Sequence, residues 1–181
     1  MRALKVDDLD DLVIPRAIRT APHLWTCLEL AIRSRSKDQR YGAIVTLVSG
    51  TILGTGYNRR LQRNEPCPIK TSFFLHAEAD AIRSAILEVG EQRIWGARLY
   101  LAGFMVDTQR PLVRRHDRIN DGSCVRCAEL YVRYDVSPMV FTERGWVRLR
   151  PAQALRNARR TREWLKSSGK SSREHRIEIA L

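Results

Sequence analysis

The sequence has no apolar run of the length that a membrane-spanning helix needs, which is about 20 residues. It also lacks the apolar core of a secretory signal peptide, because residues 1–5 lead into four aspartates. Its 181 residues are enough for one domain with a proper core and too few for two. We therefore expect a single cytoplasmic domain without a membrane partner.

Cysteine is scarce, with only Cys27, Cys67, Cys124 and Cys127 in the chain. Without an export signal, these residues are poor candidates for disulfides. The last two form a Cys-x-x-Cys pair, which points to metal or redox chemistry. We expect Cys27 and Cys67 to be buried thiols.

Acidic residues are outnumbered, with 20 Asp and Glu against 32 Lys and Arg, so the net charge is +12. The excess is concentrated in residues 144–176, which hold eleven basic and two acidic side chains. Such an excess favours a phosphate-bearing partner, either a nucleotide or a nucleic-acid strand. The same charge could simply keep a helix and a tail solvated, and composition does not decide between the two interpretations.

Hydrophobic periodicity predicts alternating helices and strands. The predicted helices cover residues 23–35, 76–89, 124–134 and 151–166, and the predicted strands cover 42–48, 51–57, 97–103 and 138–142. Residues 58–71 and 105–122 are expected to be loops, and 144–150 a linker. This order argues for a layered α/β domain with helices flanking one sheet.

The domain is expected to cover residues 22–166 and to contain the basic loop 105–122 as an insertion. Residues 1–21 are expected to form an irregular N-terminal arm, and residues 167–181 a basic tail.

One imidazole and two thiols stand at predicted helix starts. His76 opens one helix, and Cys124 and Cys127 open another, which together supply three ligands for a tetrahedral zinc ion. Three protein ligands leave the fourth position to water, as in catalytic sites. Glu78 can take a proton from that water and pass it to a substrate, for example to a ring nitrogen and a departing amine of that substrate. The helix dipole at Cys124 and Cys127 favours thiolates.

Each half of this pattern has a less specific interpretation. His-x-Glu at a helix start is common by chance, and Cys-x-x-Cys is also found as a redox pair or as two buried thiols. The redox interpretation is weakened because no thioredoxin-like unit precedes the cysteines. A structural zinc site with four ligands, using Cys67 or His116, is the main alternative to a catalytic zinc.

His76-Ala-Glu78 with Cys124-x-x-Cys127 resembles the signature H-x-E … P-C-x-x-C of the zinc nucleobase deaminases. Residues 41–45 and 54–58 resemble the hairpin of deoxycytidylate, cytidine and transfer-RNA-type deaminases, and residues 97–101 and 137–142 resemble their third and fourth strands. The resemblance covers roughly residues 22–145. It implies a three-layer α/β/α sandwich around a mixed five-stranded sheet.

The resemblance also implies the roles of individual residues. The histidine and the two cysteines would bind zinc, and the glutamate would be the proton shuttle. Asn58 would contact the sugar, Gly42 and Ala43 would border the base, and the backbone of Ala77 would meet a ring carbonyl or amide. Because relatives commonly associate, a homo-oligomer is compatible with this resemblance.

Two features depart from the family pattern. Ser123 stands where the signature has proline, which loosens the turn and removes no ligand, and we count Ser123 among the residues expected to line the substrate pocket. Cys124 follows Glu78 by 46 positions, which is more than is typical, because loop 105–122 is inserted between them. That loop would lie beside the pocket.

The substrate is less determined than the chemistry. Arg59, Arg60 and Arg63 follow Asn58, where deoxycytidylate deaminases also place phosphate contacts, although an arginine-rich loop can be merely solvated. This favours a nucleotide such as deoxycytidylate, with cytosine converted to uracil. Apart from the likeness to deoxycytidylate deaminases, nothing in the sequence distinguishes a cytosine substrate from an adenine substrate.

Single-stranded DNA or RNA is the alternative substrate. Such a strand needs a basic groove and stacking aromatic side chains. The groove candidates are Arg114, Arg115, Arg118 and the arginines of helix 151–166, with Trp146 and Trp164 nearby, although the pattern favours Trp164 as a core residue. An inactive fold used as a binding module is disfavoured, because all three ligands and the glutamate are present.

Overall fold

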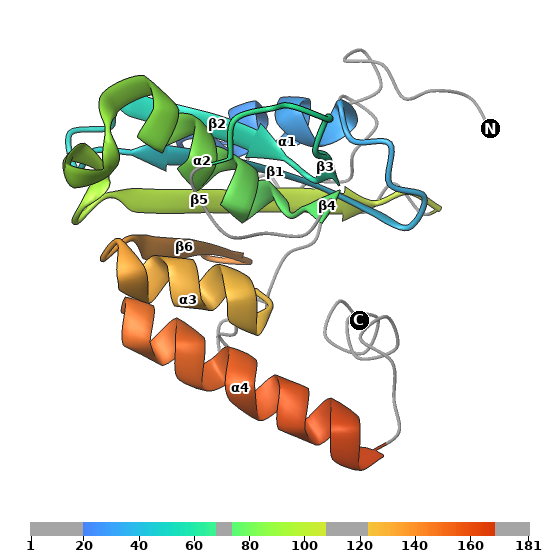
Figure 1. Cartoon of the computed structure of the whole chain (residues 1–181). Coiled ribbons are helices and arrows are strands. Elements are labelled where there is room, and N and C mark those ends of the chain that lie inside the picture. The colour runs from blue at the N-terminus through green and yellow to red at the C-terminus, as the bar shows by residue number, and fades with distance from the viewer. Residues whose placement is uncertain (1–19, 68–73, 108–122, 169–181) are drawn as a thin grey trace.

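The computed structural model describes residues 20–67, 74–107 and 123–168. Five strands form one sheet in the order β2-β1-β5-β6-β7 (Figure 1). The strands are β1 (Gln39–Thr46), β2 (Ile52–Tyr57), β5 (Arg98–Met105), β6 (Ser137–Thr142) and β7 (Gly145–Arg148). β5 and β6 are parallel and the other neighbours are antiparallel. The mixed five-stranded sheet implied by the resemblance is confirmed.

Helices cover both faces of the sheet. They are α1 (Leu24–Ile32), α2 (Ala77–Val89), α3 (Val125–Arg133) and α4 (Pro151–Ser168), with a short 3-10 helix, η3, at Glu91–Ile94. Side chains alternate along β1, so Ile44 packs with α1 whereas Ala43 and Val45 pack with α2, α3 and α4. The sheet is therefore the middle layer of three (Figure 1).

The contact between β2 and α2 is unusually close because both elements present small residues there. A Cβ atom added to Gly56 would lie 2.2 Å from the backbone nitrogen of Ala81, and one added to Gly54 would lie 2.4 Å from that of Ala85. Only glycine fits at such separations. The backbone of β2 therefore fixes where α2 lies and, with it, where the first turn of α2 is held.

The predicted linker 144–150 is wrong, because residues 145–148 form β7. This strand pairs antiparallel with β6, with Phe141 opposite Trp146 and Thr142 opposite Gly145. Four residues are too few to show a strand periodicity, and the flanking arginines gave the segment the composition of a linker. Pairing with β6 supplies the backbone hydrogen bonds that make it a strand.

Two other boundaries also differ from the predictions. β1 begins at Gln39 and not at 42, because its first residues pair with the end of β5. The expected loop 58–71 begins with the two-residue strand β3 (Arg59–Arg60), which pairs with β4 (Phe74–Leu75) just before α2. This pairing brings the segment after Asn58 next to the start of α2.

The two tryptophans proposed as stacking residues lie apart. Trp146 is partly buried and packs against the core cluster that includes α1, edge-on to Tyr100, and its indole nitrogen donates to the Pro22 carbonyl over 2.7 Å. Trp164 lies on α4 and is 39% exposed, so the expectation of a core position is wrong. The physical reason is that α4 buries only Ala154 and Ala158, both in its first half, and among the described residues its second half extends away from the sheet (Figure 1).

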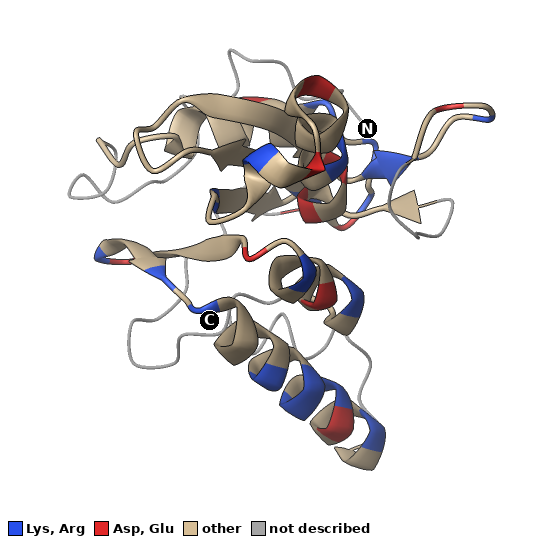
Figure 2. Ribbon diagram, turned by 60° about the vertical axis from the view of Figure 1, so that its left-hand side comes forward, with Lys and Arg blue, Asp and Glu red and all other residues tan. Residues whose placement is uncertain are grey.

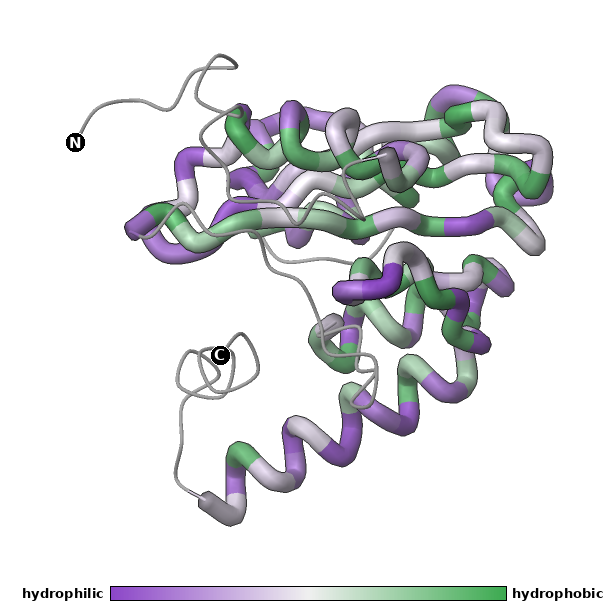
Figure 3. Tube along the Cα trace, turned by 180° about the vertical axis from the view of Figure 1, so that it is seen from behind, coloured by the Kyte–Doolittle hydropathy of each residue, from purple (hydrophilic) through white to green (hydrophobic). Residues whose placement is uncertain are grey.

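Hydropathy follows this arrangement, with apolar residues along the sheet and polar residues along the second half of α4 (Figure 3). Within the described ranges, no helix is long and apolar enough to cross a membrane. Residues 1–19, 108–122 and 169–181, which include most of the predicted arm, inserted loop and tail, lie outside those ranges, as do Arg114, Arg115, His116 and Arg118.

Candidate active site

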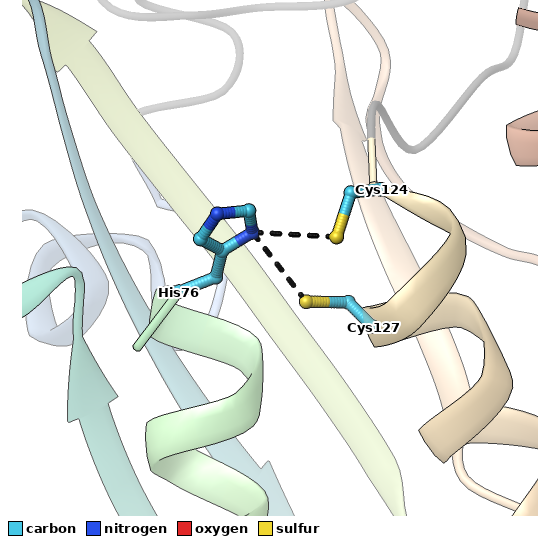
Figure 4. A group of neighbouring side chains, drawn as sticks. All are labelled: His76, Cys124 and Cys127. Carbon is cyan, nitrogen blue, oxygen red and sulfur yellow. Dashed lines mark hydrogen bonds between the residues drawn. The ribbon is translucent and has the colours of Figure 1, made fainter. Parts of the chain in front are cut away.

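His76, Cys124 and Cys127 come together where two helices begin. His76 is the N-cap of α2, and Cys124 is the N-cap of α3. Both residues have extended backbone geometry, at φ −75° and −72°, which is the usual N-cap conformation. Cys127 lies one turn into α3, so its thiol and that of Cys124 face the same imidazole (Figure 4).

The two nitrogen–sulfur distances among the three donor atoms match those of a tetrahedral metal site. His76 Nδ1 lies 3.5 Å from Cys124 Sγ and 3.6 Å from Cys127 Sγ, and all three ligand atoms lie within 4.8 Å of one another. Zinc bonds of about 2.3 Å to sulfur and about 2.0 Å to nitrogen in tetrahedral geometry place sulfur and nitrogen about 3.5 Å apart. The residues present therefore fit a zinc ion.

The environment of Cys124 favours the thiolate that a metal binds. Its pKa is lowered to about 4 by hydrogen bonding to Cys127 and by His76, against the effect of partial burial. The start of α3 adds the positive end of a helix dipole. Cys27, in contrast, is fully buried as expected, and burial raises the pKa of its thiol to about 12.

The four-ligand alternative finds no support in the described part of the chain. There, the group of residues able to hold a metal consists of His76, Cys124 and Cys127, without Cys67. Cys67 is half-buried and packs against the core beneath α2. The other candidate, His116, lies outside the described residues.

Glu78 lies in the first turn of α2, two residues after His76, and is 6% exposed. Burial raises the pKa of its carboxyl group, because desolvation disfavours the charged form. Ser123 Oγ donates a hydrogen bond to Glu78 Oε1 over 3.2 Å, and the Tyr131 hydroxyl lies 2.8 Å from Ser123 Oγ. A buried carboxyl group beside a metal-ligand set is suited to moving protons.

Ser123 and Tyr131 form hydrogen bonds that sequence reasoning missed. The sequence predicts only a looser turn and a pocket-lining position for Ser123, and a helical position for Tyr131. The signal available in the sequence was the hydroxyl at position 123, adjacent to a ligand. Its partners lie 45 and eight positions away, and only the folded chain brings them together.

Asn58 is buried, and its side chain is hydrogen-bonded to the backbone of β1. Its Oδ1 accepts a hydrogen bond from the Tyr41 backbone N–H over 2.7 Å, and its Nδ2 donates to the Gln39 carbonyl over 3.1 Å. Each end of an amide can make two hydrogen bonds, so each retains capacity for a further one. The contact with a sugar stays a prediction, made from a side chain that β1 already orients.

The residues expected around the base lie on different sides of β1. A Cβ atom added to Gly42 would fall 2.0 Å from the Cys27 carbonyl oxygen, so Gly42 faces α1. Ala43 and Ala77 are fully buried in the core cluster on the α2 side. Contacts of a base with these three residues stay predictions.

Arg59 is held by two carboxylates. Its guanidinium donates to Asp80 Oδ1 over 2.9 Å and to Glu65 Oε1 over 2.5 Å, and it is 18% exposed. Arg83 also pairs with Glu65 and donates to the Pro66 carbonyl. These ion pairs raise the pKa of Arg59 and lower that of Glu65 to about 2. A phosphate at Arg59 would have to compete with both carboxylates, and that contact stays a prediction.

The remaining cations of this segment, Arg60 and Arg63, are exposed. Phe74 lies on the paired strand β4, is 42% exposed, and has its ring centroid 6.2 Å from that of His76 in an edge-on arrangement. Sequence reasoning missed this aromatic side chain, since a single Phe beside a histidine carries no periodic signal. It places an apolar face next to the metal-ligand set.

A family model matches the segment of the chain that contains these residues. The profile described as the cytidine and deoxycytidylate deaminase zinc-binding region matches residues 21–143, which include both helix starts of the site. No curated protein matches the chain significantly. A similar solved structure is that of the dCMP deaminase from the cyanophage S-TIM5 in apo form, at 22% identity and a TM-score of 0.29. The match covers 53% of this chain and 60% of the phage protein.

Proposed function

The chain belongs to the family that shares the cytidine and deoxycytidylate deaminase zinc-binding region. We propose that it is a zinc-dependent enzyme that removes the amino group of a cytosine base by hydrolysis and so gives uracil. The observation that carries this proposal is the set of one imidazole and two thiols at zinc-ligand spacing, with the buried Glu78 carboxyl group two residues after the histidine.

His76, Cys124 and Cys127 would hold the zinc ion, which when bound polarises a water molecule and lowers its pKa. Glu78 takes a proton from the attacking water as the oxygen adds to C4 of the base. The carboxyl group passes that proton to the ring nitrogen N3. The remaining proton of the hydroxyl group now on C4 reaches the amine through the same carboxyl group, the C4–N4 bond breaks, ammonia leaves, and C4 keeps the oxygen as the uracil carbonyl.

We propose a nucleotide such as deoxycytidylate as the substrate. Arg60 and Arg63 are exposed cations that closely follow Asn58 along the chain, so a phosphate next to a sugar held by Asn58 has two candidate partners. Phe74 would contribute an apolar surface for the base. An association of several copies stays a proposal.

A polynucleotide substrate is the second candidate, and the exposed basic face of α4 favours it. Figure 2 shows Lys and Arg residues along most of this helix. The exposed cations on it are Arg156, Arg159, Arg160, Arg162 and Lys166. Regularly spaced cations on one helix can follow a phosphate backbone.

The test is to incubate the zinc-loaded protein with deoxycytidylate, deoxycytidine, deoxyadenylate, single-stranded DNA and single-stranded RNA, and to measure uracil, hypoxanthine and ammonia. We expect uracil from deoxycytidylate at low and moderate salt. Uracil formed only in strands, with a rate that falls steeply as salt rises, would support the second candidate. Absence of product from every substrate would contradict both.

A further inference from the structure

Two buried hydroxyl groups are linked to the Glu78 carboxylate by successive hydrogen bonds. Ser123 Oγ is 3.2 Å from Glu78 Oε1, and the Tyr131 hydroxyl is 2.8 Å from Ser123 Oγ. Ser123 is 6% exposed and Tyr131 is fully buried. Because solvent has little access to these groups, the hydrogen bonds between them satisfy polar atoms that would otherwise be costly to bury.

The direction of the two hydrogen bonds follows from the available protons. A serine hydroxyl carries one hydrogen, and Ser123 donates it to the carboxylate. The Tyr131 hydroxyl must then donate to Ser123 Oγ. Each donor in such a series polarises the next, which strengthens the final bond to the ionised carboxylate.

This pair of hydrogen bonds joins the two helices that carry the metal ligands. Ser123 directly precedes Cys124, Tyr131 lies farther along α3, and Glu78 lies in the first turn of α2. The family signature has proline at the position of Ser123, and proline has no hydroxyl to donate. This chain therefore has a hydrogen bond to the proton shuttle where the signature residue offers none.

We propose that Ser123, itself oriented by Tyr131, is a positioning residue that holds Glu78 Oε1 and so presents the other carboxylate oxygen, Oε2, to the water and the base. The terminal torsion of a glutamate is soft, and fixing it before the substrate arrives favours proton transfer. The consequence for turnover rests on the proposed deaminase function, whereas the presence of the two hydrogen bonds does not depend on it.

The activity test compares S123A, Y131F and S123T as zinc-loaded proteins. The first two variants each remove one hydroxyl and leave the neighbouring packing in place. We expect kcat to fall about tenfold or more in S123A, with KM and zinc content unchanged, and to recover in S123T, which retains a hydroxyl. We expect the single variant Y131F to lower kcat. We expect no further decrease in kcat when Y131F is added to S123A, because Tyr131 acts through Ser123.

Two outcomes of that test would overturn the inference. One is a kcat of S123A within twofold of the wild-type value at equal zinc content. The other is a further fall in kcat when Y131F is added to S123A.

An unfolding test gives a readout that does not need turnover. In zinc-loaded protein, S123A should lower the urea midpoint of the wild type and have a much smaller effect in the E78A background, where no carboxylate accepts the hydrogen bond. Equal midpoint shifts in both backgrounds would overturn the inference. A wild-type protein that deaminates no substrate would overturn the proposed function instead, and the midpoints would still decide whether Ser123 binds Glu78.

Discussion

α2 and α4 lie in the same outer layer but differ sharply in how much of each helix is buried. α2 buries eight of its 13 residues, whereas α4 buries only Ala154 and Ala158 of its 18. The residues proposed to carry the chemistry lie at the start of α2, and the exposed arginines lie on α4. The comparison indicates that α2 holds its residues by burial, whereas charges on α4 can change at little cost in stability.

The largest effect is expected from a substitution in the close contact between β2 and α2. In G56A, the new Cβ atom would lie 2.2 Å from the Ala81 backbone nitrogen, and backbone on both sides would have to shift. We expect a loss of about 3 kcal/mol in the free energy of unfolding, together with weaker zinc retention, because α2 carries His76. Urea unfolding and zinc analysis check this prediction.

The matched control lies on α4. R160A removes an exposed side chain with no role in packing, so we expect no measurable change in the urea midpoint. A G56A protein as stable as R160A would contradict the account of the close contact between β2 and α2.

The next effect concerns the ion pairs that join the segment after Asn58 to α2. E65Q removes the carboxylate shared by Arg59 and Arg83, and we expect a loss of about 2 kcal/mol at neutral pH. The folded-state pKa of Glu65, about 2, lies below its ordinary value of 4.5. Its stabilising contribution is therefore complete above about pH 4.5 and is lost as the pH falls toward 2.

The pH dependence gives a sharper test of the same ion pairs. The difference in the free energy of unfolding between wild type and E65Q should shrink from pH 6 to pH 3. E29Q, which changes an exposed glutamate on α1, should show little difference at either pH. A difference for E65Q that stays constant with pH would show that charge on Glu65 does not provide the stabilisation.

A smaller effect tests the exposed cations after Asn58. R60A and R63A should each raise KM for deoxycytidylate about tenfold and leave KM for deoxycytidine unchanged, because only the nucleotide has a phosphate. K37A, which removes an exposed cation elsewhere, is the control. Equal changes in KM for both substrates would argue against a phosphate contact.

The smallest effect is expected on α4. R159A/R160A should leave urea unfolding and the deamination of deoxycytidylate unchanged, since both arginines are exposed and lie on the poorly buried helix. If polynucleotides are the substrates, the double variant should bind single-stranded DNA more weakly. The slope of the logarithm of the binding constant against the logarithm of salt concentration should also fall in magnitude by about one per lost phosphate contact. Fluorescence anisotropy across a salt series distinguishes the two outcomes.

The metal-ligand set was predictable from the sequence because its signals are local. His76 and Cys124 each stand where an apolar helical periodicity begins, and the structure places each of them as an N-cap. The order of α1, β1, β2, α2, β5, α3, β6 and α4 was predictable from local hydrophobic periodicity in the same way. The likeness to the deaminases then supplied the sheet that brings the two helix starts together.

What could not be predicted depends on partners distant in sequence. β7 is a strand because β6 lies beside it, and Arg59 is neutralised because folding brings Asp80 next to it. The position of Trp146 under α1 and the hydrogen bond from Ser123 to Glu78 are set in the same way. Composition and periodicity carry no information on such contacts.

The central claim is that a zinc ion held by His76, Cys124 and Cys127 acts together with the Glu78 carboxylate. The most direct measurement is zinc content and uracil formation from deoxycytidylate for E78Q beside the wild type. The account predicts about one zinc per chain in both proteins and product from the wild type alone. Product formation by E78Q at the wild-type rate, or a wild-type protein that retains no zinc, would contradict it.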